Sequence, residues 1–223
     1  MKKFLITAIF LGCLANGYSQ CFPLDTGKLK QSYHELMNNP RTIQREKAFF
    51  DAFPSSWMEL ILTYRYHNAK EYDKTMNYLH AEHIYAFGDL TLIPDSTYIE
   101  KFIHLAIGGK WDADSPNVRF QETLHRNMEK KTNVFFQLLS KQSRGYQLRF
   151  WLFFWSSMFH TEDGGSLGHE QEYNMMCESI KNKVKAKYPD EVKTMEIALP
   201  YALGEVLGSF GLFEDFPHLY FSK

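Results

Sequence analysis

The stretch IGGKWDADSPNVRFQ, residues 107–121, decides how the rest of this chain is interpreted. Its glycine pair, lysine, tryptophan and spaced aspartates suit three structures: a phosphate-binding loop, a calcium loop, or a connection between two helices. A phosphate-binding loop needs a glycine five positions before Gly109 and a serine or threonine directly after Lys110. The chain has His104 and Trp111 at those positions, so this loop is excluded.

A calcium loop of the EF-hand type is excluded by the same kind of comparison. If the loop began at Asp112, it would need an acidic or amide residue at its fifth position, glycine at the sixth and glutamate at the twelfth. The chain has Pro116, Asn117 and Thr123 there.

A connection between two helices explains more of the stretch. Gly108 and Gly109 can adopt the left-handed conformation that commonly ends a helix. Ser115 followed by Pro116 is typical of a helix start, and acidic residues are favoured just before it. Helix ends do not require a lysine beside a tryptophan, so this pair either binds a partner, which is our prediction, or only fills the joint between the two helices. The candidate binding residues are Lys110, Trp111, Asp112 and Asp114.

Helical spacing of apolar residues extends outward from this connection over nearly the whole chain, and the alternation typical of strands is absent. Ser56 and Glu59 have the spacing of a capping box at a further helix start. The predicted helices cover residues 29–38, 43–53, 57–64, 74–87, 95–107, 115 onward, 133–139, 145–159, 172–188 and 190–207. We therefore expect an all-α fold of about ten short helices, in a compact bundle or in stacked helical hairpins.

The N-terminus has the pattern of a secretory signal peptide. Lys2 and Lys3 precede an apolar run over residues 4–15, which is too short to span a membrane. We expect residues 1–19 to be removed and residues 20–223 to form a single domain. Lipidation needs small residues just before the modified cysteine, and Phe10-Leu11-Gly12 before Cys13 and Gln20 before Cys21 fit this poorly. The expected product is exported, periplasmic or secreted, and unanchored, with lipidation as the less favoured alternative.

Charge and cysteine content limit the possible functions further. Loss of the two signal lysines would change the formal net charge from −1 to −3, and no basic stripe remains for nucleic acid. The longest later apolar run, residues 150–159, is too short for a membrane span. Cys21 and Cys177 remain in the mature chain, and their spacing leaves open whether they form a disulfide.

The histidines offer a weak metal-site hypothesis. His80 and His83 lie three residues apart on one predicted helix and could share a metal ion. Their HxEH pattern, with Glu82 inside it, matches neither HExxH nor HxxEH of zinc proteases. A third ligand would have to come from His104, His160 or His169.

Other segments leave their roles open. The polar loop HTEDGGSLGHE, residues 160–170, suits an exposed connection or a binding loop. The chain has no GxSxG motif and no cysteine in a catalytic setting. Aromatic residues make up 16% of the chain, which fits either a packed core or a concave aromatic surface.

Four blocks together resemble an uncharacterised family of short exported helical proteins of Bacteroidota. The blocks are FFDAFPSSWMEL (49–60), IGGKWDAD (107–114), FFQLLSKQS (135–143) and FWLFF (150–154), and the family patterns are FFxAFPxxFxEL, IGGKWxAD, KLLSxxS and FWxFFF. The chain departs from the family after the last block, where Trp155-Ser156-Ser157 replaces a loop with aspartate, glycine and proline. The resemblance implies a helical fold and a recurring unit at residues 108–111, and it implies no activity.

The leading functional hypothesis is an exported helical protein that binds a protein partner without catalysis or cofactor. A second hypothesis is a metal-dependent hydrolase that uses His80 and His83. A third is a carrier of a small apolar ligand in an aromatic-lined pocket between helices.

Overall fold

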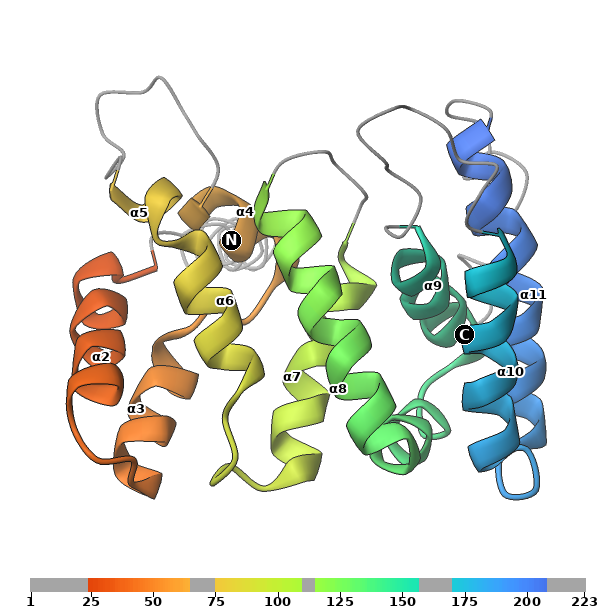
Figure 1. Cartoon of the computed structure of the whole chain (residues 1–223), viewed down its shortest axis with the longest axis horizontal. Helices are drawn as coiled ribbons and strands as arrows, with labels where there is room; N and C mark the ends of the chain where they lie inside the picture. The colour runs from red at the N-terminus through yellow and green to blue at the C-terminus, as the bar shows by residue number, and fades with distance from the viewer. Residues whose placement is uncertain (1–23, 65–74, 110–114, 157–169, 208–223) are drawn as a thin grey trace, which may run out of the picture.

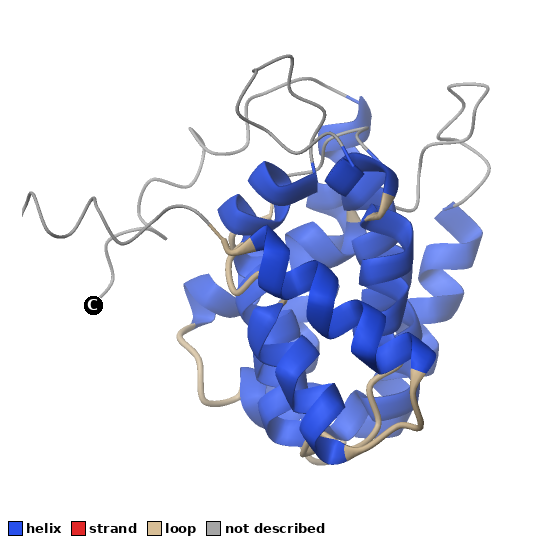
Figure 2. Cartoon of the chain, turned by 90° about the vertical axis from the view of Figure 1, so that its left-hand side faces the viewer, coloured by secondary structure: helices blue, strands red, loops and turns tan. Residues whose placement is uncertain are grey.

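The computed structural model of the chain describes residues 24–64, 75–109, 115–156 and 170–207. Within these ranges every regular element is a helix and no strand is present, which confirms the all-α class (Figures 1 and 2). The helices are α2 (Thr26–Asn38), α3 (Ile43–Ala52), α4 (Trp57–Tyr64), α5 (Thr75–Tyr78), α6 (His80–Gly88), α7 (Asp95–Ile107), α8 (Ser115–Leu139), α9 (Arg144–Trp155), α10 (Glu170–Val184) and α11 (Pro189–Leu207).

The helices stand side by side in a row that follows the chain (Figure 1). Helices α2 and α3 pack together at one end, α6, α7 and α8 form the middle, and α9 packs between α7 and α11 towards the other end. None of the helices in the described ranges is both long and apolar enough to cross a membrane.

Side-chain caps explain why several helices begin where they do. The carboxylate of Asp25 accepts a hydrogen bond from the backbone amide of Lys28 at 2.9 Å and starts α2. The hydroxyl of Ser56 accepts from the amide of Glu59 at 3.2 Å, as the capping-box pattern predicts. The Glu59 carboxylate, however, binds the amide and hydroxyl of Ser55, each at 2.7 Å. The return contact of the box is therefore shifted by one residue.

Two of the predicted helices are divided or joined differently in the structure. The helix expected over residues 74–87 is divided into α5 and α6, because the amide of Leu79 bonds to the carbonyl of Met76, three residues back, in a tighter turn. The helix expected separately over residues 133–139 is instead the second arm of α8. Lys131, with φ −126° and ψ 30°, forms the kink between the two arms.

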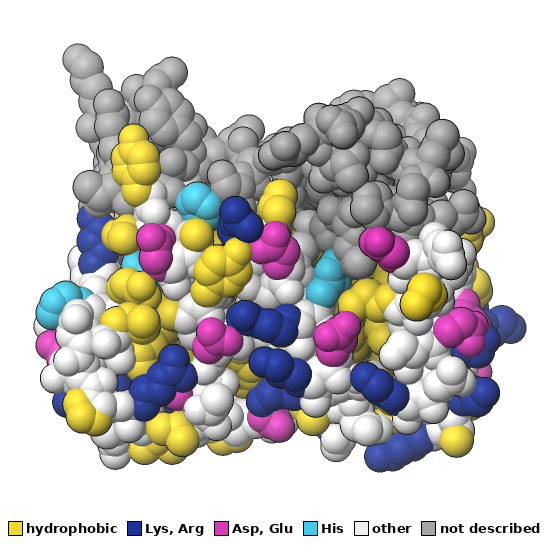
Figure 3. All heavy atoms as spheres, in the orientation of Figure 1, with side chains coloured by type: hydrophobic (Ala, Val, Ile, Leu, Met, Phe, Trp, Pro, Cys, Tyr) yellow, Lys and Arg dark blue, Asp and Glu magenta, His cyan; other side chains and the backbone are white. Residues whose placement is uncertain are grey.

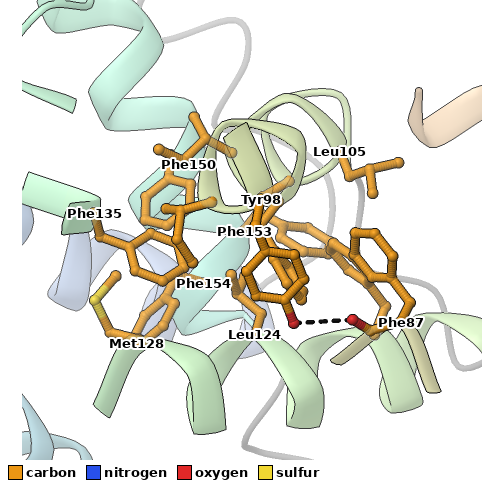
Figure 4. Close-up of a cluster of buried hydrophobic side chains, with 14 of the residues drawn as sticks. Phe87, Tyr98, Leu105, Leu124, Met128, Phe135, Phe150, Phe153 and Phe154 are labelled. Atoms are coloured by element: carbon orange, nitrogen blue, oxygen red, sulfur yellow. Dashed lines mark hydrogen bonds between the residues drawn. The ribbon is translucent and has the colours of Figure 1, made fainter. Parts of the chain in front are cut away.

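The largest fully buried side chains of the described residues are aromatic, and they pack the interior. Within the most aromatic helix, α9, every aromatic side chain except Tyr146 is buried, and the helix packs against α7, α8 and α11. The hydroxyl of Tyr98 donates to the carbonyl of Phe87 at 2.9 Å inside this core (Figure 4). The cluster in that view includes Phe87, Tyr98, Leu105, Leu124, Met128, Phe135, Phe150, Phe153 and Phe154.

Two buried or partly buried charges tie the N-terminal helices to their neighbours. The Glu46 carboxylate is fully buried and accepts from the amides of Thr91 and Leu92 at 2.8 and 2.7 Å, which holds the connection between α6 and α7 against α3. The Lys101 ammonium on α7 donates to the carbonyl of Phe53 at 2.7 Å, near the end of α3. Burial lowers the pKa of Lys101 to about 8.

Charges on the exposed face of the middle helices are mixed in sign (Figure 3). Arg126 on α8 pairs with Asp89 at 3.0 Å, and Arg119 pairs with Glu122 at 3.1 Å. Such exposed pairs contribute little to stability, about 0–1 kcal/mol each.

Candidate functional site

The glycine pair at the end of α7 has a different role from the one expected. Gly108 has φ −83° and ψ −7°, which is right-handed, and Gly109 has no left-handed φ either. The prediction of a left-handed helix end is therefore wrong. The amide of Gly109 instead closes the last turn with the carbonyl of Ala106 at 2.9 Å.

Close packing explains why these two positions are glycine. A Cβ atom on Gly108 would lie 3.0 Å from the Cβ of Trp57, at the start of α4. A Cβ atom on Gly109 would lie 2.3 Å from the Cδ2 of Phe153, on α9. Carbon atoms make van der Waals contact at about 3.5–4.0 Å. The missing side chains therefore let α4 and α9 approach the end of α7.

The aromatic rings around the glycines complete one packed unit. The rings of Trp57 and Phe153 lie 4.9 Å apart in an edge-to-face arrangement. Phe120 of α8 lies 6.1 Å from each of them. We call these five residues, Trp57, Gly108, Gly109, Phe120 and Phe153, the glycine joint.

The glycine joint brings together three of the four sequence blocks. Trp57 belongs to FFDAFPSSWMEL, the glycines to IGGKWDAD and Phe153 to FWLFF. The block at residues 135–143 lies elsewhere: it buries Phe135 and Phe136 in the core, and its Ser143 caps the start of α9. The order of the blocks could be recognised in the sequence, but the contact between them could not be predicted from it.

Polar side chains of α8 satisfy the last carbonyls of α9 next to the joint. The amide of Gln121, which is buried, donates to the carbonyl of Phe153 at 2.9 Å. The Nε2 of His125 bonds to the carbonyl of Phe154 at 2.7 Å. Burial lowers the pKa of His125 to about 4, although this carbonyl favours the charged form. His125 is thus a neutral donor at pH 7, and sequence analysis did not single out either side chain.

The predicted binding residues Lys110, Trp111, Asp112 and Asp114 lie outside the described residues, as does most of the loop at residues 160–170. The structure does describe the residues on either side of residues 110–114. Gly109 is packed against Phe153, and α8 begins at Ser115, as predicted.

The two histidines of the metal hypothesis have different surroundings. His83 is fully buried, and its Nδ1 lies 3.1 Å from the hydroxyl of Tyr64. His80 is only partly buried, and His104 on α7 is exposed. No three or more histidine, cysteine or acidic side chains in the described ranges are placed to hold a metal ion together. The hypothesis stays a prediction that would need a ligand such as His160 or His169, both outside those ranges.

A groove of about 320 Å³ lies between α8 and α10. Its apolar lining consists of Met175, Met176 and Ile180, so it differs from the aromatic-lined pocket expected of a carrier. Cys177, on the same helix, is buried with a free thiol, and burial raises its pKa to about 11. Cys21, its possible disulfide partner, lies outside the described residues.

Comparison of the chain with models of protein families, with curated proteins and with solved structures finds no match. The resemblance to the Bacteroidota family stays a prediction that rests on the four blocks.

Proposed function

We propose that this chain is an exported helical protein that acts by binding a protein partner, and that the contact is made by residues 110–114 on the glycine joint. The glycine joint is the observation that carries the proposal. Packing against α4 and α9 accounts for Gly108 and Gly109, but it gives no reason for a lysine and a tryptophan directly after them. Binding residues commonly lie on connections that a rigid scaffold positions.

The neighbouring helices support a contact with another protein. Met58, which follows Trp57 of the joint, is 60% exposed, and Tyr78 on α5 is 76% exposed. Helices α4 and α5 contact each other. Methionine and tyrosine are enriched in protein interfaces, and large apolar side chains that stay in water often mark them.

The experiment is partner capture with matched variants of the full chain. Trp111→Ala and Lys110→Glu change the proposed contact, and Tyr146→Ser is the control, because Tyr146 is also exposed but lies in the first turn of α9, away from Phe153. We expect one partner to be recovered by the unchanged chain and by the control, and at least tenfold less by the two variants. Equal recovery by all four proteins would overturn the proposed contact, and equal melting temperatures would show that the variants are folded.

Export is tested separately. If residues 1–19 are a signal peptide, N-terminal sequencing of the protein from the exported fraction should begin at or near Gln20. An intact Met1 on protein from the cytoplasm would contradict export without affecting the binding proposal.

A further inference from the structure

His83 lies at the point where four N-terminal helices meet. Its ring, on α6, is 4.4 Å from that of Tyr33 on α2 and 6.0 Å from that of Phe49 on α3. Its Nδ1 contacts the hydroxyl of Tyr64 at the end of α4. Its Nε2 is buried and has no hydrogen-bond partner among the residues that the structure describes. A fully buried imidazole with one nitrogen unpartnered therefore sits in an aromatic enclosure.

The enclosure accepts the neutral ring better than the charged one. A neutral imidazole has one donor and one acceptor nitrogen, and either suits a hydroxyl at Nδ1. A charged imidazolium is a donor at both nitrogens, so Tyr64 must accept at Nδ1 while the N–H at Nε2 is left without an acceptor. Burying a charge and an unsatisfied N–H together is unfavourable.

The charged groups around His83 do not offset this cost. From α2, Lys30 adds a positive charge that opposes protonation. On α3, Glu46 lies one turn before Phe49, and it is held by backbone amides of the connection between α6 and α7. On α6 itself, Glu82 is exposed, and its negative charge adds to burial in raising the pKa of Tyr33.

The other helices next to α6 also lack a counter-ion for this ring. Helix α8 meets α6 through Glu122, which binds the hydroxyl of Tyr85, and through Arg126, which pairs with Asp89. From α4, the titratable group in contact with the His83 ring is the Tyr64 hydroxyl. Burial raises the pKa of Tyr64 well above its ordinary value. Among the described residues, no carboxylate forms an ion pair with His83.

We propose that His83 is an acid-sensitive latch, whose neutral ring holds α2, α3 and α4 on α6 and whose protonation releases them. Burial, together with Lys30, lowers the pKa of His83 to about 4 from an ordinary value of 6.5. In the released state the ring is solvated and binds a proton at its ordinary pKa. Between pH 6.5 and about 4 the released state therefore binds more protons, and acid favours it.

The test is hydrogen exchange of the full chain from pH 7 to pH 4.5, corrected for intrinsic exchange rates. We expect the opening of α2, α3 and α6 to increase by about tenfold for each pH unit below 6.5, because one proton is taken up on release. His83→Asn keeps an uncharged polar atom near the position of Nδ1 and should remove this dependence. His34→Gln, on the exposed part of α2, is the control and should keep it.

Direct titration of His83 in the unchanged protein covers the case in which His83→Asn does not fold. The expected result is a histidine resonance that stays neutral down to about pH 5 and changes together with loss of α2 and α3 protection. Titration near pH 6.5 with unchanged protection would overturn the latch. So would a His83→Asn variant that is folded and equally acid-sensitive.

Discussion

The two halves of the molecule each place a histidine against aromatic rings, His83 fully buried and His125 partly buried, but they satisfy its nitrogens differently. In the N-terminal half, His83 contacts the hydroxyl of Tyr64 through Nδ1, and no described residue bonds to its Nε2. In the C-terminal half, His125 contacts Phe154 edge-to-face at 4.4 Å and bonds to the carbonyl of the same residue through Nε2. A carbonyl accepts a hydrogen bond from either charge state of His125, whereas the N–H of a charged His83 is left unsatisfied.

The comparison separates two contributions of a buried histidine. Burial acts against the charge and is the main cause that lowers both pKa values to about 4, with a smaller contribution from Lys30 at His83. Hydrogen bonding then decides what protonation does to the local structure. We expect protonation of His83 to disrupt the contacts between four helices, and protonation of His125 to leave its bond to α9 in place.

The largest expected effect is on packing, and it should be similar in the two halves. Phe49 and Phe154 are both fully buried and both contact a histidine ring. Replacement of either by alanine should lower the free energy of unfolding by about 3–5 kcal/mol at pH 7.5, since a large ring leaves a cavity. Urea denaturation of both variants measures this.

A loss for one variant that is less than half the loss for the other would break the comparison. It would show that the two clusters differ in packing and not only in hydrogen bonding. Leu92→Ser, at a residue that is 43% exposed, is a control that should change stability by no more than about 0.5 kcal/mol.

The next effect is the pH dependence due to His125. The folded chain resists protonating this ring until about pH 4, whereas the unfolded chain binds the proton near pH 6.5. Stability is therefore unaffected above pH 6.5 and falls as the pH drops from 6.5 to 4, by about 3 kcal/mol if the whole shift is expressed. His125→Gln can place an amide nitrogen near Nε2, keep the bond to Phe154 and remove this part of the fall.

Unfolding of the unchanged protein and of His125→Gln at pH 7.5, 6, 5 and 4.5 measures the effect. The two stability curves should converge as the pH falls, because only the unchanged protein loses stability through His125. Parallel curves would contradict a buried neutral His125. As the pH is lowered, hydrogen exchange should increase in α2 and α3 at a higher pH than in α9. This order would distinguish protonation of His83 from protonation of His125.

Local signals were sufficient for much of this fold. The helix at residues 95–107 has the predicted bounds, and Ser115 begins the next helix, because caps and apolar spacing act over a few residues. The tight turn that divides the helix at residues 75–88 was not visible in the apolar spacing, and the burial of His83 depends on contacts between helices that spacing does not encode.

The glycine joint shows the same limit within the candidate site. Sequence reasoning located Gly108 and Gly109 at a helix end, but assigned them a left-handed conformation that they do not have. A Cβ at these positions would meet Trp57 and Phe153, which are about 50 and 45 residues away in the chain, and at Gly109 it would also lie 2.9 Å from the carbonyl of Ala106. A local rule gave the position and missed the cause.

The smallest predicted change in stability comes from replacing these two glycines. Gly108 packs against Trp57 in the N-terminal half, and Gly109 packs against Phe153 in the C-terminal half. Gly109→Ala places a Cβ 2.3 Å from a ring carbon of Phe153, which is buried and held by Trp57 and Phe120, so we expect a loss of about 1–3 kcal/mol. Gly108→Ala meets Trp57 at 3.0 Å, and the entropy that alanine removes from the unfolded chain, about 0.4–1 kcal/mol, should offset most of that strain.

Thermal and urea unfolding of both variants and of the double variant Gly109→Ala, Phe153→Leu measure this difference. If the ring of Phe153 is the obstacle, Gly109→Ala should cost less in the Phe153→Leu background than in the unchanged chain. If the two single glycine variants lose the same free energy of unfolding, the Phe153 ring can move away from an added Cβ as easily as Trp57 can. Residues 110–114 would then follow a joint that can shift, and the rigid base on which the binding proposal depends would be lost.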